Sequence, residues 1–192
     1  ARNQLYKTLY GMRAAVEEVA LQDSSGAYDV IRGKEEHAAT PFTHILGLKV
    51  HSGDLLVSRG GAEVSAFISR GNDYPGNFSH VALIYIDEKT NKPWLVEAHI
   101  EKGVAIASVE DYIKDKKLRF MVLRPRFDLP ELKADSLLPQ KAAKLAFEEA
   151  VKRHIPYDFK MDYSDTTAMF CSEVGSYAYK KYSLQLWKPV SS

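Results

Sequence analysis

Cys171 is the only cysteine among 192 residues, and it lies where a loop rich in Asp, Ser and Thr turns into a helical pattern. The first turn of a helix presents unpaired backbone N–H groups and the positive end of the macrodipole, and both favour a thiolate over a thiol. The N–H of Cys171 is also a natural oxyanion donor. This position predicts a nucleophile, although a free cysteine is commonly just a small buried hydrophobic residue.

A nucleophilic cysteine needs a base to take its proton and a polar group to orient that base. The chain has six histidines, and four have structural explanations as loop or helix-end residues: His37, His44, His51 and His154. His80 is different, because it alternates with Ala82, Ile84 and Ile86 on one face of a predicted strand. An imidazole on such a face is desolvated unless a partner meets it. We therefore expect His80 to be either the base or a core histidine with a polar partner.

An antiparallel hairpin is predicted from two apolar runs, residues 79–86 and 94–100. The polar turn between them is centred near residues 89–90. Such a turn places position 80 opposite positions 98–99 on the returning strand.

Two side chains on that returning strand could orient His80. Glu97 is flanked by Val96 and Ala98 in an apolar run, where an unpaired charge would be unfavourable. His99 lies on the same strand face and is the rival candidate. Sequence spacing does not choose between Glu97 and His99, because a strand register read from sequence can shift by one residue.

The remaining patterns predict a mixture of strands and helices. Further strands are predicted at residues 45–50, 55–58, 103–107 and 119–123. Helices are predicted at residues 4–20 with Asn3 as a cap, in a short stretch opening at Ser108, and at residues 136–154 and 169–182. The order predicts an α+β fold in which an antiparallel sheet packs against the helix that bears Cys171.

Composition excludes several functions. Lys and Arg number 26 against 25 Asp and Glu, so the formal charge is +1 and no global field attracts nucleic acid. No run approaches the roughly 18 apolar residues of a membrane span, so we expect no transmembrane segment. Paired-cysteine zinc, phosphate-loop and dinucleotide motifs are missing, so we expect no metal and no cofactor. The chain begins at Ala1 without a methionine, which fits removal of a signal peptide; export to the periplasm or cell envelope is one expectation.

The motifs together resemble the permuted NlpC/P60 papain-like proteins, specifically the YiiX-like branch. The resemblance rests on GDLLV at 53–57, FSHVALIY at 78–85, VEA at 96–98, YD at 157–158 and FCSE at 170–173. Its distinctive feature is the order histidine, glutamate, cysteine, the reverse of papain-like chains in which the cysteine helix comes first. It covers residues 45–182 and implies a circularly permuted papain-like α+β fold.

The resemblance also implies roles for individual residues. It implies Cys171 as nucleophile, His80 as base and Glu97, rather than His99, as orienting group. Tyr157 matches a tyrosine often found near the nucleophile, so it is expected to contact substrate; a loop tyrosine packed on the core is the alternative.

The family pattern gives a domain division and a reaction class. Residues 1–40, a helix and an extension, match nothing in the family, and residues 41–192 are expected to form the catalytic domain. The implied activity is hydrolysis of an amide bond in a cell-wall type peptide or an amidated amino acid, through a thioester. The alternatives are a lipid acyltransferase or thioesterase using the same residues, favoured by an apolar groove around Phe67, Tyr74 and Phe78, and a non-catalytic binding module.

Overall fold

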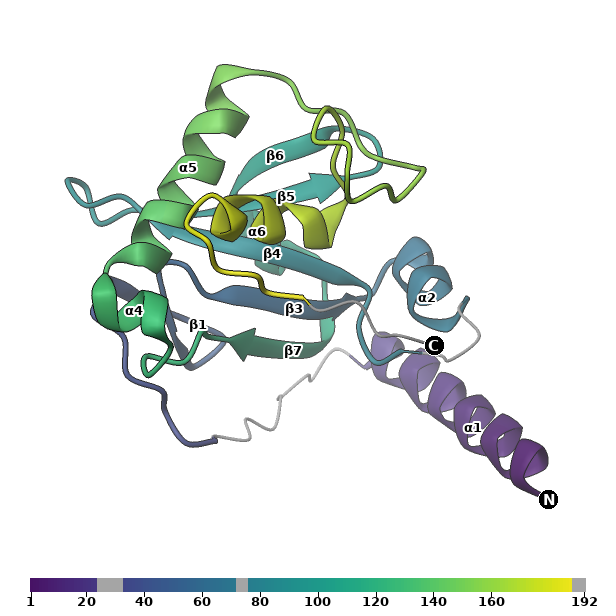
Figure 1. Ribbon diagram of the computed structural model, residues 1–192. Helices are drawn as coiled ribbons and strands as arrows, with labels where there is room; N and C mark the ends of the chain where they lie inside the picture. The colour runs from purple at the N-terminus through teal and green to yellow at the C-terminus, as the bar shows by residue number, and fades with distance from the viewer. Residues whose placement is uncertain (24–32, 72–75, 188–192) are drawn as a thin grey trace.

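The structure, a computed structural model, describes residues 1–23, 33–71 and 76–187 (Figure 1). Its centre is a five-stranded antiparallel sheet with the strand order β6-β5-β4-β3-β7. The strands are β3 (Leu55–Gly60), β4 (His80–Ile86), β5 (Pro93–His99), β6 (Gly103–Ser108) and β7 (Lys117–Leu123). A separate hairpin contains β1 (Phe42–Ile45) and β2 (Leu48–His51).

Helices cover both faces of this sheet. They are α1 (Arg2–Gln22), α2 (Glu63–Arg70), α3 (Val109–Lys114), α4 (Pro130–Ala134), α5 (Leu138–Lys152) and α6 (Cys171–Lys180). On one face α5 and α6 pack against β4 and β5 and enclose the larger apolar core (Figure 1). On the other face Tyr112 of α3 and the β1–β2 hairpin cover a second core that includes Ala82 and Ile84. The predicted α+β architecture is confirmed.

The β4–β5 hairpin has the predicted register. Ala82 pairs with Glu97, which centres the turn between residues 89 and 90. The carboxylate of Asp87 accepts backbone N–H groups within this turn and closes it. Because the turn sets the register locally, it also places His80 on the same face of the sheet as Glu97.

The stretch from β1 to α2 differs from the prediction. The strand predicted over residues 45–50 is broken by a turn at Leu46 and Gly47, whose φ angles are +49° and +77°. Glycine adopts such a φ without strain, so the chain reverses here into the β1–β2 hairpin. Helix α2 was not predicted, because a helix of eight residues after two glycines gives little periodic signal.

Helix boundaries also differ in detail. Asn3 lies inside α1, and Ala1 occupies its N-cap position. The last helix begins at Cys171 rather than at residue 169, so the cysteine is its first residue. Phe170 is the N-cap, and its backbone N–H donates to the side chain of Glu173. Residues 71–77 are rich in turn-forming types and predict a loop before β4, but most of this stretch lies outside the described residues.

Helix α1 projects from the body and is attached through its C-terminal half (Figure 1). The carboxylate of Glu17 is 3% exposed and lies 2.5 Å from Arg70, 2.6 Å from Arg119 and 3.6 Å from Arg59. Burial raises the pKa of Glu17, but hydrogen bonds from Arg70 and Arg119 more than offset this and hold it below 4.5. A buried carboxylate, rather than an apolar face, therefore attaches α1 to the body.

Glu17→Gln is expected to lower the free energy of unfolding by about 3 kcal/mol, because it leaves the fully buried Arg59 without its charged partner. Urea denaturation at neutral pH measures this change. The stabilisation is present above the unfolded pKa of 4.5 and is lost as the pH falls through the lowered folded pKa. The difference between wild type and Glu17→Gln should therefore shrink in acid.

A matched control is Glu18→Gln, since Glu18 is 58% exposed and reaches Arg70 only at 3.5 Å. This substitution should change the free energy of unfolding by less than about 0.5 kcal/mol. Equal effects of the two substitutions would show that the buried cluster does not stabilise the fold.

Candidate active site

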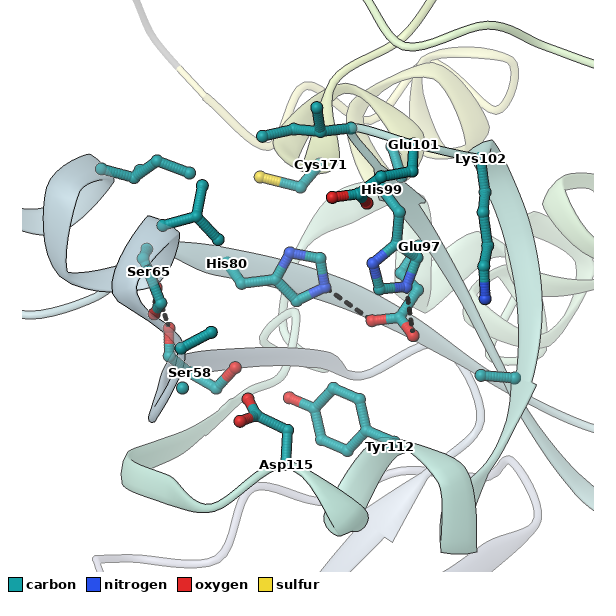
Figure 2. A pocket seen from close by; sticks show the side chains of 18 of the residues that line it. Ser58, Ser65, His80, Glu97, His99, Glu101, Lys102, Tyr112, Asp115 and Cys171 are labelled. Carbon is teal, nitrogen blue, oxygen red and sulfur yellow. Dashed lines mark hydrogen bonds and ion pairs between the residues drawn. The ribbon is translucent and has the colours of Figure 1, made fainter. Parts of the chain in front are cut away.

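Three predicted residues converge at one end of the sheet. Cys171 is the first residue of α6, His80 is the first residue of β4, and Glu97 lies on β5. Helix α6 packs against β4 and β5, so its N-terminal end reaches the start of β4. All three side chains line the same cavity (Figure 2).

His80 and Glu97 are in direct contact. The Nε2 atom of His80 lies 2.6 Å from Oε2 of Glu97. The other ring nitrogen, Nδ1, lies on the side of Cys171 (Figure 2). The neighbouring His99 lies 3.0 Å from Oε1 of Glu97, and its ring stacks on that of His80 at 5.6 Å between centroids. Of the two candidates, Glu97 is the group that contacts a ring nitrogen of His80.

The environment of Cys171 favours the thiolate. Burial raises the pKa of the Cys171 thiol, but the hydrogen bond and positive charge of His80 more than offset this. The backbone N–H groups of Val81 and Ser172 lower the pKa further, so it lies below the ordinary value of 9.0. Because Cys171 opens α6, its own N–H has no acceptor within the helix.

The pKa of His80 is raised and that of Glu97 is lowered, so both shifts favour the charged form. Burial lowers the pKa of His80, but hydrogen bonds to Cys171 and Glu97 and the charges of both groups raise it to about 9. Burial raises the pKa of Glu97, whereas hydrogen bonds from His80 and His99 lower it to about 2. These shifts all favour the charged forms, so they favour a thiolate, an imidazolium and a carboxylate in a row.

Beside these residues lies a cavity of about 380 Å³. Tyr157 borders it together with Cys171. Burial and the negative charge of Cys171 raise the pKa of Tyr157, so its hydroxyl stays protonated and can donate a hydrogen bond. The segment that carries it is held by β6, since the N–H of Val104 donates to the carbonyl of Ile155 at 2.8 Å.

The polar floor of this cavity was not predicted from the sequence. Ser58 on β3, Tyr112 on α3 and Asp115 after α3 point toward one another beneath His80 (Figure 2). Ser58 and Tyr112 are at most 3% exposed, and neither hydroxyl has a hydrogen-bond partner among the described residues. These residues come from separate elements with no shared motif, so only the fold brings them together.

Within residues 1–23, 33–71 and 76–187, no group of three or more His, Cys, Asp or Glu side chains could hold a metal ion. In the same part of the chain, no helix combines the length and the apolar character needed to cross a membrane.

Comparisons with known proteins agree with the fold. The sequence profile of the permuted papain-like amidases, YaeF/YiiX, matches residues 49–190. A crystal structure described as the metalloprotein YiiX from Escherichia coli O157:H7 superimposes with a TM-score of 0.55 at 21% identity. The match covers 72% of this chain and 70% of the other. No curated protein sequence matches the chain significantly.

Proposed function

Because the chain belongs to the YaeF/YiiX family of permuted papain-like amidases, we propose that it hydrolyses an amide bond through a thioester acyl-enzyme. One observation carries the proposal: the sulfur of Cys171, the ring of His80 and the carboxylate of Glu97 follow one another in a single cavity. In this proposal Cys171 is the nucleophile, His80 is the general base and acid, and Glu97 orients His80.

The reaction would proceed in two halves. The thiolate of Cys171 attacks the amide carbonyl, and the imidazolium of His80 protonates the leaving amine as the C–N bond breaks. Water, deprotonated by His80, then attacks the thioester and releases the carboxylic acid and the thiolate. In this proposal the N–H of Cys171 and the hydroxyl of Tyr157 donate to the oxyanion that forms in each half, since Cys171 opens α6 and Tyr157 borders the same cavity.

The cavity lining is mixed. Val64, Ile68 and Ile100 border it together with Glu101, Lys102, Asp111 and Asp115. Charged groups among apolar ones suit a peptide or an amino-acid amide, because an acyl chain would leave those charges without a polar partner.

The described residues give little support for an apolar groove around Phe67, Tyr74 and Phe78, which would favour a lipid substrate. Phe67 is 76% exposed, and neither it nor Phe78 lines the cavity. Tyr74 lies outside the described residues.

The substrate class is tested by incubating the purified chain with a panel of muropeptides and amino-acid amides and with a panel of phospholipids. We expect turnover of amides, and a mass increase on Cys171 that matches the acyl group when the reaction is quenched early. Cys171→Ser is the control for contaminating hydrolases. Turnover restricted to the phospholipids would replace the amidase proposal with an acyltransferase or thioesterase.

Glu97→Gln is expected to lower kcat/KM by about 10²-fold while leaving measurable activity. The amide keeps the shape of the side chain, but it removes the charge that raises the pKa of His80. The activity of Glu97→Gln should therefore decline at a lower pH on the alkaline side than that of wild type.

The matched variant is His99→Gln, which removes only the second partner of Glu97. We expect it to lose less than about tenfold in kcat/KM, because the contact between His80 and Glu97 is kept. A greater loss in His99→Gln than in Glu97→Gln would make His99 the orienting residue.

A further inference from the structure

The first five turns of α1 carry an apolar stripe that faces solvent. Leu5, Leu9, Met12, Val16 and Val19 are between 53% and 69% exposed. Their spacing of four, three, four and three residues places them in one line along the helix. A stripe of this width is narrower than the face of a helix that packs on a globular core, and it matches the seam of a coiled coil.

This part of α1 receives little support from the body. Within the described residues, every hydrogen bond and ion pair between α1 and the body comes from Arg13 or from later residues. The first three turns project beyond the body (Figure 1). A helical segment of that length is marginal in water without tertiary packing, so an uncovered apolar stripe at this place indicates a missing partner.

We propose that α1 is a dimerisation arm and that its stripe pairs with the same stripe of a second copy of this chain. The heptad spacing requires a helix with the same period, and a second copy supplies one. The flanking positions carry the neutral residues Tyr6, Thr8 and Ala15 and one charged residue, Arg13. Arg13 contacts Glu17, Asn77 and the carbonyl of Gly76 in its own chain.

The pairing is antiparallel. Arg2, Lys7 and Arg13 make the N-terminal half of α1 basic, and its first acidic residue is Glu17. Parallel pairing would bring the two basic halves and the two macrodipoles side by side, whereas antiparallel pairing opposes the dipoles. The body lies at the C-terminal end of α1, so antiparallel helices also hold the two bodies at opposite ends (Figure 1).

Antiparallel packing fixes a register. Leu5 lies opposite Val16 of the second copy, and Leu9 lies opposite Met12, in four apolar layers about a two-fold axis. Neither Cys171 nor any other residue of the proposed active site takes part, so the dimer can be tested without an assay of activity.

The first test measures the mass of the intact chain in solution. At about 50 µM, light scattering should give twice the chain mass of 21.6 kDa for wild type, and the single chain mass for Leu9→Glu combined with Met12→Glu. Both residues are exposed in the single chain, so charges there leave the fold intact, which circular dichroism verifies. The control, Asn3→Glu with Gln4→Glu, adds the same charge off the stripe and should remain a dimer.

The second test measures the orientation of the helices. In a Cys171→Ser background, Leu9→Cys mixed with Met12→Cys should form a disulfide-linked pair, and either variant alone should cross-link at least tenfold less. Efficient cross-linking of Leu9→Cys with itself would overturn the antiparallel arrangement.

Other outcomes would overturn the whole proposal. A wild-type monomer at about 50 µM, or a dimer that survives the Leu9→Glu and Met12→Glu substitutions, would show that the stripe is not the interface. Flotation of a monomeric wild-type chain with phosphatidylglycerol vesicles, abolished by the same substitutions, would assign the stripe to a membrane surface instead.

Discussion

Cys171→Ala is expected to reduce turnover of an amide substrate by about 10⁴-fold or more, because no other group in the chain can form the thioester. The fold should remain intact, since the change removes a single atom at the start of α6. It also removes a thiolate that burial disfavours, so the melting temperature should stay the same or rise by a few degrees. Initial rates and thermal unfolding measure the two effects.

The control for Cys171→Ala is Ser176→Ala, one turn further along α6. Among the residues that the structure describes, the hydroxyl of Ser176 bonds only to the carbonyl of Ser172 in its own helix, so its loss should leave the rate within about threefold of wild type. Appreciable turnover by Cys171→Ala would show that another group is the nucleophile and would end the proposed mechanism.

His80→Ala is expected to slow the alkylation of Cys171 by iodoacetamide at about pH 6, where only the thiolate reacts. Without His80, the burial that raises the pKa of Cys171 is no longer offset by the neighbouring positive charge. The thiolate fraction falls tenfold for each unit by which the pKa rises, so we expect labelling of His80→Ala to slow by at least about tenfold. Mass spectrometry of the intact chain follows the reaction.

The pH dependence gives a second readout of the same pair. The thiolate–imidazolium form exists above the lowered pKa of Cys171 and below the pKa of His80, which is about 9. Wild-type activity should therefore fall as the pH rises through about 9, because neutral imidazole can no longer protonate the leaving amine. The alkylation rate of His80→Ala should instead rise up to and beyond the ordinary thiol range.

His99→Ala is the matched control for the labelling experiment, since it removes a stacked imidazole but keeps the bond between His80 and Glu97. Its labelling at about pH 6 should stay within threefold of wild type. If His80→Ala were labelled as fast as wild type, the thiol would not be activated by His80, and a non-catalytic binding module would become the better interpretation.

Much of this site could be predicted because its information is local. The polar turn between β4 and β5 sets the hairpin register, so the sequence placed His80 and Glu97 on neighbouring strands before any tertiary contact was known. The change from polar loop to apolar period likewise placed Cys171 at a helix start, within two residues of where α6 begins. Family membership and the α+β class rested on these same motifs, and both are confirmed.

Some local features were not predicted because the sequence patterns for strands, turns and helices are weak or mixed at those residues. The apolar run at residues 45–50 predicted a strand, but the turn at Leu46 and Gly47 divides it. Helix α2 is held by contacts with distant residues, among them the ion pair of Arg70 with Glu17, and its own sequence carries little helical signal. Three expectations stay predictions: the roles of Cys171, His80, Glu97 and Tyr157, the division into two domains, and export of the protein.

The sequence by itself determined which chemistry is available: one thiol at a helix start, and an imidazole and a carboxylate on paired strands. Only the tertiary structure decided that Glu97, and not His99, forms the hydrogen bond with a ring nitrogen of His80, because that choice depends on side-chain geometry to a fraction of an ångström. It also decided that Ser58, Tyr112 and Asp115 form the cavity floor, and that α1 attaches by Glu17 and leaves its apolar stripe in solvent. Such contacts join residues that are far apart in the chain. Sequence periodicity depends only on residues that are close in the chain, so it cannot predict these contacts.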